Sequence, residues 1–72
     1  MKTFREMIVE KLSFEIEHCG ISQRKLAEKI GVHPSMITDY KSGKKFPSLE
    51  TFALLCKIIG ADANYILGIK DI

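Results

Sequence analysis

Positively charged residues gather in the middle third of this sequence. The segment from Ser22 to Lys45 contains six lysines and arginines and two acidic residues, a net charge of +4. The flanking segments, 1–21 and 46–72, carry −1 each. Clustered cations of this kind can replace the counterions of a phosphate backbone and so bind nucleic acid. We therefore expect an anion-binding surface here rather than only a solvated face that keeps the chain soluble.

Residue types that support catalysis or metal binding are present but scattered. His18 and His33 stand apart from any nucleophile that they could activate. Cys19 and Cys56 form no CxxC pair and have no clustered histidines, so we expect buried free thiols and no metal site. A chain of 72 residues is also too small to enclose an ordinary substrate pocket. We predict no catalytic residues, no cofactor and no small-molecule substrate.

The length and composition predict one domain, 1–72. No apolar run approaches the roughly 20 residues that span a membrane. The N-terminus, Met-Lys-Thr-Phe-Arg-Glu, lacks the apolar core of a signal peptide. We expect a cytoplasmic protein without a membrane contact.

Five glycines punctuate the chain, and each follows an amphipathic run where a helix would need a left-handed cap. They are Gly20, Gly31, Gly43, Gly60 and Gly68. The pattern predicts an all-α fold with helices over 3–18, 23–30, 34–42, 49–59 and 63–67. No segment alternates apolar and polar residues for long enough to indicate a strand.

The segment 22–43 predicts two short helices joined by a tight turn, a helix-turn-helix. Ser22 is a good N-cap for the first helix, and Gly31 suits the turn. Pro34 fits the first position of the second helix, which His33 caps weakly and Gly43 ends. Helices of about two turns are not stable alone, so the motif must pack on the remaining helices.

Apolar residues at three- and four-residue spacing predict the core stripes of the longer helices. Helix 3–18 has Phe4, Ile8, Leu12, Ile16 and Cys19, and helix 49–59 has Leu49, Phe52, Ala53, Cys56 and Ile59. Leu54 and Ile58 lie off the second stripe. With Tyr65, Ile69 and Ile72 they could form a two-fold contact between two copies. The alternative is that the last helix folds over Leu54 and Ile58.

The motif and its surroundings resemble the Cro and lambda-repressor family of helix-turn-helix proteins. The resemblance runs through LAEKIGV at 26–32, SGK at 42–44, PSL at 47–49 and YILG at 65–68, and covers residues 8–68. It implies a five-helix lambda-repressor-like domain that binds double-stranded DNA and usually dimerises on a two-fold operator. The small size resembles the Cro-like proteins of temperate phage switches, including the modulator-of-repression type of lactococcal phages.

Carried over position by position, the resemblance implies a DNA interface on both helices of the motif. It implies a phosphate contact for Gln23, groove-facing positions for five residues that begin the second helix, and backbone contacts for three lysines. These are His33, Pro34, Ser35, Thr38 and Asp39 in the groove, and Lys41, Lys44 and Lys45 on the backbone. Arg24, in the first turn of the first motif helix, is expected to bind a phosphate docked at that helix N-terminus.

The groove-facing set contains no Arg, Gln or Asn, the side chains that make strong bidentate contacts to bases. Lys41 also stands where the family more often has Glu. These departures leave an alternative function open, in which the domain binds a repressor from the same locus by protein contact. Met36, Asp39 and Ser35 would then face the partner, because Met adapts to apolar surfaces and Asp39 can pair with a basic residue. A third alternative is an assembly module with no DNA role.

Overall fold

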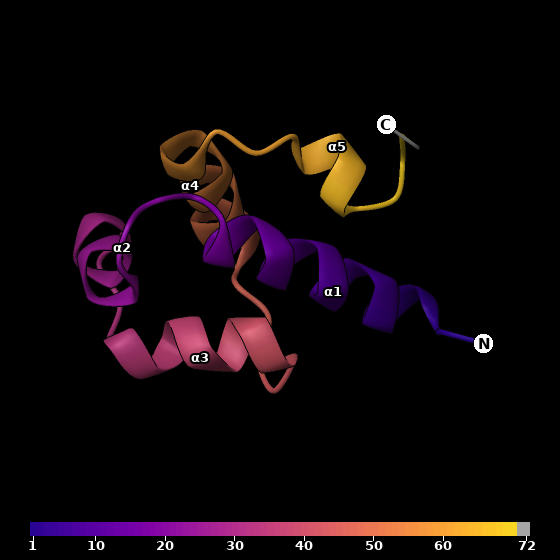
Figure 1. Ribbon diagram of the computed structural model, residues 1–72, viewed down its shortest axis with the longest axis horizontal. Helices are drawn as coiled ribbons and strands as arrows, with labels where there is room; N and C mark the ends of the chain where they lie inside the picture. Colours follow the sequence, from indigo (N-terminus) through magenta and orange to yellow (C-terminus); the bar gives the residue numbers. More distant parts are fainter. Residues whose placement is uncertain (71–72) are drawn as a thin grey trace.

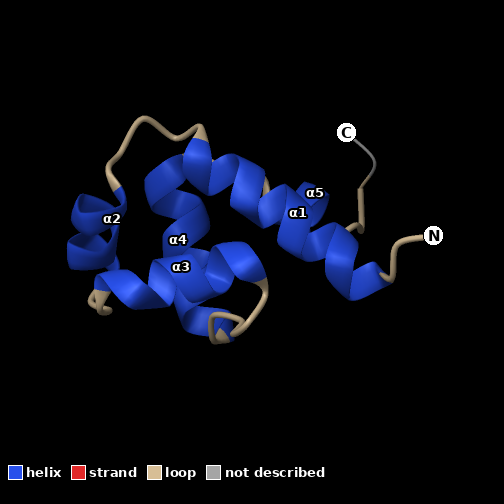
Figure 2. Cartoon of the chain, turned by 60° about the horizontal axis from the view of Figure 1, so that its bottom comes forward, coloured by secondary structure: helices blue, strands red, loops and turns tan. Residues whose placement is uncertain are grey.

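The chain folds as five helices, and the computed structural model describes residues 1–70 (Figures 1 and 2). The helices are α1 (Phe4–Glu17), α2 (Gln23–Ile30), α3 (Pro34–Ser42), α4 (Leu49–Ile59) and α5 (Ala63–Ile66). No strand occurs in this part of the chain. The predicted all-α architecture is confirmed, and the predicted ends lie within one residue of those observed.

Local capping explains where most helices begin. The hydroxyls of Ser22 and Ser48 accept from the backbone N–H three residues on, and the Asp62 carboxylate accepts from Asn64 and Tyr65. Each such cap satisfies a backbone donor that the helix leaves unpaired. α1 begins with a complete capping box that was not predicted, in which the Thr3 and Glu6 side chains each accept from the other residue's backbone N–H.

The core lies where α1, α2, α3 and α4 meet, with one residue from α5. Leu26, Ile37, Leu55 and Ile66 are fully buried at its centre. Leu12, Ile16, Ala27 and Tyr40 are also buried, as their helix spacing predicts. Because both motif helices contribute to this one core, the motif is held rigidly on the rest of the domain.

Two predicted core stripes are partly wrong. On α4, Leu49 and Ala53 are exposed, whereas Leu55, which was not predicted, is fully buried. Leu49 lies in the first turn, and the buried face of α4 starts at Phe52. Phe4, in the first turn of α1, is 64% exposed, and Cys19 is only half-buried.

The helices are arranged so that α3 lies along one side of α1 and runs in the opposite direction (Figure 1). The C-terminal end of α3 therefore reaches the N-terminal half of α1. α2 sits at the other end of α3 and contacts α4 (Figure 1). This arrangement of the helices leaves the side of α3 that faces away from α1 and α4 open. Within the described residues, no helix is long and apolar enough to cross a bilayer.

Candidate nucleic-acid interface

The turn between α2 and α3 sets the angle of the motif. Gly31 adopts a left-handed conformation with φ of 75°, and the Val32 N–H donates to the Ala27 carbonyl. His33 then caps α3 through its Nδ1, which accepts from the Ser35 N–H at 3.1 Å. The predicted boundaries of both motif helices are confirmed.

The open face of α3 presents the residues that the sequence placed toward a DNA groove. Ile37 and Tyr40 are buried, so the opposite side of α3 points outward. His33, Ser35 and Thr38 are exposed, and Pro34, Met36 and Asp39 are half-buried. Met36 also packs against the core. The structure thus brings the five predicted groove-facing residues together at the start and on the outer face of α3, and Met36 lies at the edge of that face.

Two hydroxyls on this face already have protein partners. The Ser35 Oγ lies 2.9 Å from His33 Nδ1. The Thr38 Oγ1 accepts from Gln23 Nε2 at 2.6 Å, and the same Nε2 lies 3.5 Å from the Pro34 carbonyl. Gln23, the predicted phosphate contact, therefore ties the start of α2 to the outer face of α3.

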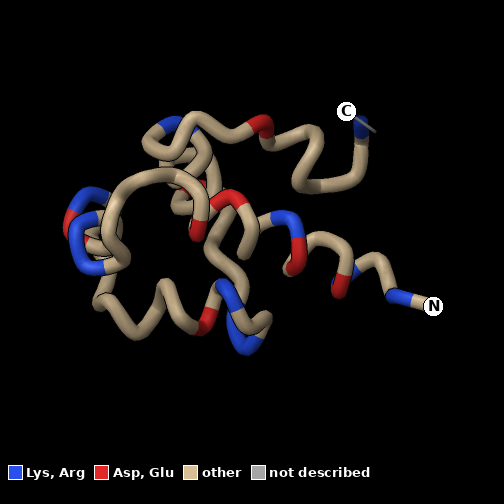
Figure 3. The backbone as a smooth tube through the Cα atoms, in the orientation of Figure 1, with Lys and Arg blue, Asp and Glu red and all other residues tan. Residues whose placement is uncertain are grey.

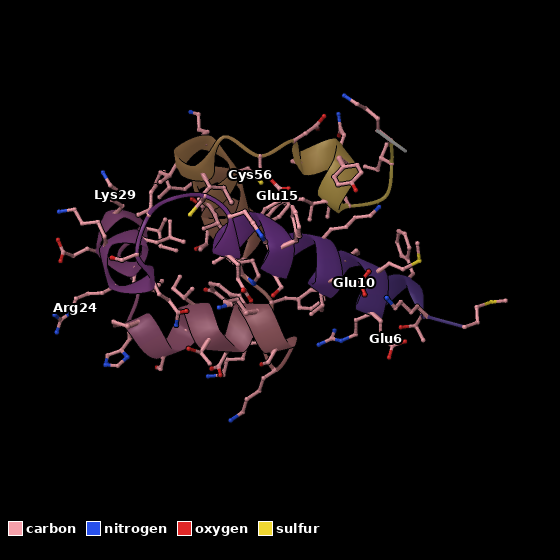
Figure 4. All side chains as sticks on the ribbon, viewed as in Figure 1. Glu6, Glu10, Glu15, Arg24, Lys29 and Cys56 are labelled. Carbon is pink, nitrogen blue, oxygen red and sulfur yellow. The ribbon has the colours of Figure 1, made fainter. Side chains whose placement is uncertain are left out.

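The predicted backbone-contacting cations fall into two kinds. Arg24, Lys44 and Lys45 are exposed, and no ion pair involves them within residues 1–70. Figure 4 shows Arg24 projecting outward from α2. Lys41 is different, because it is half-buried with its Nζ 3.5 Å from a Glu17 carboxylate oxygen. Only the first kind can meet a phosphate without breaking a contact in the protein.

Arg5 is a further cation beside the loop that carries Lys44 and Lys45, and it was not among the predicted site residues. Its guanidinium donates to the Gly43 carbonyl at 3.0 Å and lies 4.1 Å from the centre of the Phe46 ring. It thus holds the loop with Lys44 and Lys45 at both ends. A planar guanidinium suits this double contact, and its remaining N–H groups stay available to a phosphate. Arg5 is 38 residues from Gly43, so no local pattern could have identified it.

The charges are segregated between the motif and α1. Blue segments lie on α2 and after α3 in Figure 3, whereas red segments recur along α1. The four acidic residues of α1 are Glu6, Glu10, Glu15 and Glu17. This separation gives the side of the molecule that bears α2 and the end of α3 the positive potential that steers an anionic partner.

The residues predicted for a contact between two copies differ in how exposed they are. Leu54 and Ile69 are exposed, but Ile58 packs against the core and Tyr65 is half-buried beneath the Lys11 ammonium. The fifth residue of that prediction, Ile72, lies outside the described residues.

An apolar hollow of about 300 Å³ opens between α1, the loop after α3 and the start of α4. Phe46 and Leu49 stand at it, 41% and 83% exposed, over Ile8, Leu12 and Phe52. Exposed side chains of this size are uncommon in one place unless a partner covers them.

In residues 1–70, no group of three or more metal-binding side chains occurs. Cys19 and Cys56 are free, and burial raises the pKa of the Cys56 thiol.

Comparison with known proteins places the chain in a family and identifies similar proteins. A family model described as helix-turn-helix matches residues 15–66. The Bacillus subtilis (strain 168) protein named uncharacterized HTH-type transcriptional regulator YobD is 33% identical over 51 residues, which are 71% of this chain and 46% of YobD. This chain thus spans about half the length of that relative. The crystal structure of the clp gene regulator ClgR from C. glutamicum superposes with a TM-score of 0.76 and 29% identity, covering 92% of this chain and 85% of that one.

Proposed function

This chain belongs to the helix-turn-helix family, and on that premise we propose that it is a transcription regulator that binds double-stranded DNA with α3 in the major groove. In proteins of this kind the second motif helix enters the groove and the first crosses the backbone. Here Pro34, Ser35, Thr38 and Asp39 would face base edges. His33 would lie at the groove rim, where α3 begins.

One observation carries this proposal: exposed cations that have no ion pair within residues 1–70 flank both ends of the open α3 face. Arg24 lies on α2 beside the start of α3, and Lys44 and Lys45 follow its end. Phosphate contacts at two separated points fix the register of a helix in the groove. Arg24 also stands in the first turn of α2, where a bound phosphate would be favoured by the helix dipole.

The base-reading set predicts modest sequence specificity. Asp39 can only accept hydrogen bonds, which suits the amino group of cytosine, and the two hydroxyls discriminate weakly. Most of the affinity would then come from phosphate contacts, which carry no sequence information. On the resemblance to Cro-like proteins, we place this regulator at a lysis or lysogeny switch of a temperate phage.

Titration of labelled DNA tests the DNA-binding proposal. The duplexes would be the control region next to the protein's own gene and a scrambled duplex of the same composition. We expect tighter binding to the control region and a steep loss of affinity as salt rises. Absence of binding to both duplexes at low salt would exclude the function. Equal binding to both would exclude sequence-specific regulation.

A second candidate function is the one in which the domain binds a repressor from the same locus and blocks its DNA binding. Two observations favour it. The Ser35 and Thr38 hydroxyls have partners in the protein, which leaves the Asp39 carboxylate as the polar group of the face with no such partner in residues 1–70, beside Met36 at the edge of the face. Phe46 and Leu49 add an uncovered apolar surface. Asp39 would pair with an Arg or Lys that the repressor otherwise offers to DNA.

Mixing the protein with that repressor in the absence of DNA tests the second candidate. Variants Met36→Glu and Asp39→Lys probe the α3 face, and Leu49→Lys probes the apolar hollow. Weaker complex formation by the first two variants would support the α3 face as the contact surface. If only Leu49→Lys weakens the complex, the contact surface is the apolar hollow instead. If no complex forms with the wild-type protein, the second candidate is excluded.

A further inference from the structure

Lys41 is the one motif cation whose ammonium is directed into the protein. Its Nζ lies 3.5 Å from Glu17 Oε1 and 3.5 Å from Gln23 Oε1. Its side chain is 27% exposed and that of Glu17 is 54% exposed. This pair is less exposed, and so screened less, than the Lys25–Glu28 pair on the motif surface. The contact therefore competes with any outside anion for the Lys41 charge.

The position of Glu17 explains why this contact is favourable. Glu17 is the last residue of α1, and the last turn of that helix contains no basic residue. A carboxylate at a helix C-terminus faces the negative end of the helix dipole, which is unfavourable. Lys41, arriving from α3, supplies the missing cation. If Lys41 turned to a phosphate instead, the Glu17 carboxylate would lose its neighbouring cation and lie close to the negatively charged DNA backbone.

The contact continues into the motif. Lys41 lies against the carbonyl oxygen of the Gln23 side chain, whose amide donates to Thr38. A chain of contacts thus links α1 to the outer face of α3 through the start of α2. Gln23 and Lys41, both predicted phosphate contacts, are held in it together.

We propose that Glu17 is a positioning residue that withholds Lys41 from the DNA backbone, so that the domain makes one phosphate contact fewer than its motif cations allow. The inference rests on the proposed DNA binding and deepens it. Glu17 sets the salt dependence of binding without touching the DNA. Lys41 serves instead to fix Gln23 and the α2–α3 geometry.

The slope of log affinity against log salt tests the proposal, because each phosphate contact adds about 0.9 to its magnitude. Measured on one duplex, Glu17→Gln should raise the magnitude by about 0.9, since Lys41 is released. Lys41→Gln should leave the slope unchanged, and the double variant should match Lys41→Gln. Glu15→Gln is the matched control: it makes the same charge change on the same helix, but Glu15 points toward α4 and Cys56 (Figure 4).

Two results would overturn the proposal: equal slopes for Glu17→Gln and Glu15→Gln, or a slope reduced by about 0.9 in Lys41→Gln. Elution from immobilised heparin separates this failure from failure of the DNA-binding proposal. Heparin is a polyanion that needs no base reading, so Glu17→Gln should elute at higher salt than Glu15→Gln even if no duplex binds. Elution of the two variants at the same salt would refute the withholding of Lys41.

Discussion

Replacing Lys44 and Lys45 together by alanine should flatten the salt dependence of DNA binding without changing sequence preference. Both side chains are exposed, and neither has an ion pair within residues 1–70. Their loop is fixed by the Lys45 N–H, which donates to the Asp39 carbonyl at 3.3 Å, and by the two contacts of Arg5. Each lysine should therefore make one phosphate contact at little cost in loop ordering.

The magnitude follows from counterion release. Loss of two contacts lowers the slope of log affinity against log salt by about 1.8. Between about 50 and about 200 mM salt, the wild-type protein should then lose about twelvefold more affinity than the variant. Fluorescence anisotropy with one labelled duplex at several salt concentrations measures this difference.

A matched control removes the same charge from another part of the molecule. Lys57→Ala with Lys70→Ala takes two positive charges from α4 and the segment after α5, outside the motif. This control should change the slope far less than the loop variant. Equal slopes for the two double variants, both folded by circular dichroism, would refute the assignment of Lys44 and Lys45 to phosphates. A changed ranking of duplex sequences in the loop variant would instead give these lysines a role in base reading.

Three further predictions concern folding and are read from chemical unfolding. Leu55→Ala should lower the free energy of unfolding by about 2–5 kcal/mol, whereas Leu49→Ala should change it by about 0.5 kcal/mol or less; similar losses would contradict the burial of α4. Gly43→Ala should cost more than Gly31→Ala, although both place a Cβ at positive φ, because only the first meets a side chain, at 2.9 Å; equal costs would argue against that close approach. Hydrogen bonds from Thr3 lower the pKa of Glu6 from 4.5. The Glu6 charge therefore stabilises the fold fully above pH 4.5, and less as the pH falls through the lowered pKa. The difference in free energy of unfolding between wild type and Glu6→Ala should narrow in acid, and a constant difference would contradict this.

The helices could be predicted from the sequence because their ends are decided locally. A serine before a run of helix-forming residues supplies a cap, and glycine alone takes the left-handed turn without strain. Ser22, Gly31, Pro34 and Gly43 therefore set the limits of the motif wherever the rest of the chain lies. The cation cluster was visible for the same reason, since its charges are close together in sequence.

The buried face of α4 could not be decided in this way. Its sequence, LETFALLCKII, has apolar residues around most of the helix, so more than one stripe satisfies the helical period. Contact with α2 and the other core elements selects Phe52, Leu55 and Cys56. Leu49 satisfies the same period but stays 83% exposed at the apolar hollow beside α1.

Helix positions and the location of positive charge were thus determined by the sequence itself, through caps, turns and local composition. Which cations are free was decided only by the tertiary structure. Lys41 and Lys44 are equivalent by sequence, yet packing of α3 along α1 places one beside Glu17 and leaves the other in solvent. Arg5 joins the loop by the same packing. Whether a cation can bind DNA depends on the side chains next to it, and folding brings those side chains together from distant parts of the chain.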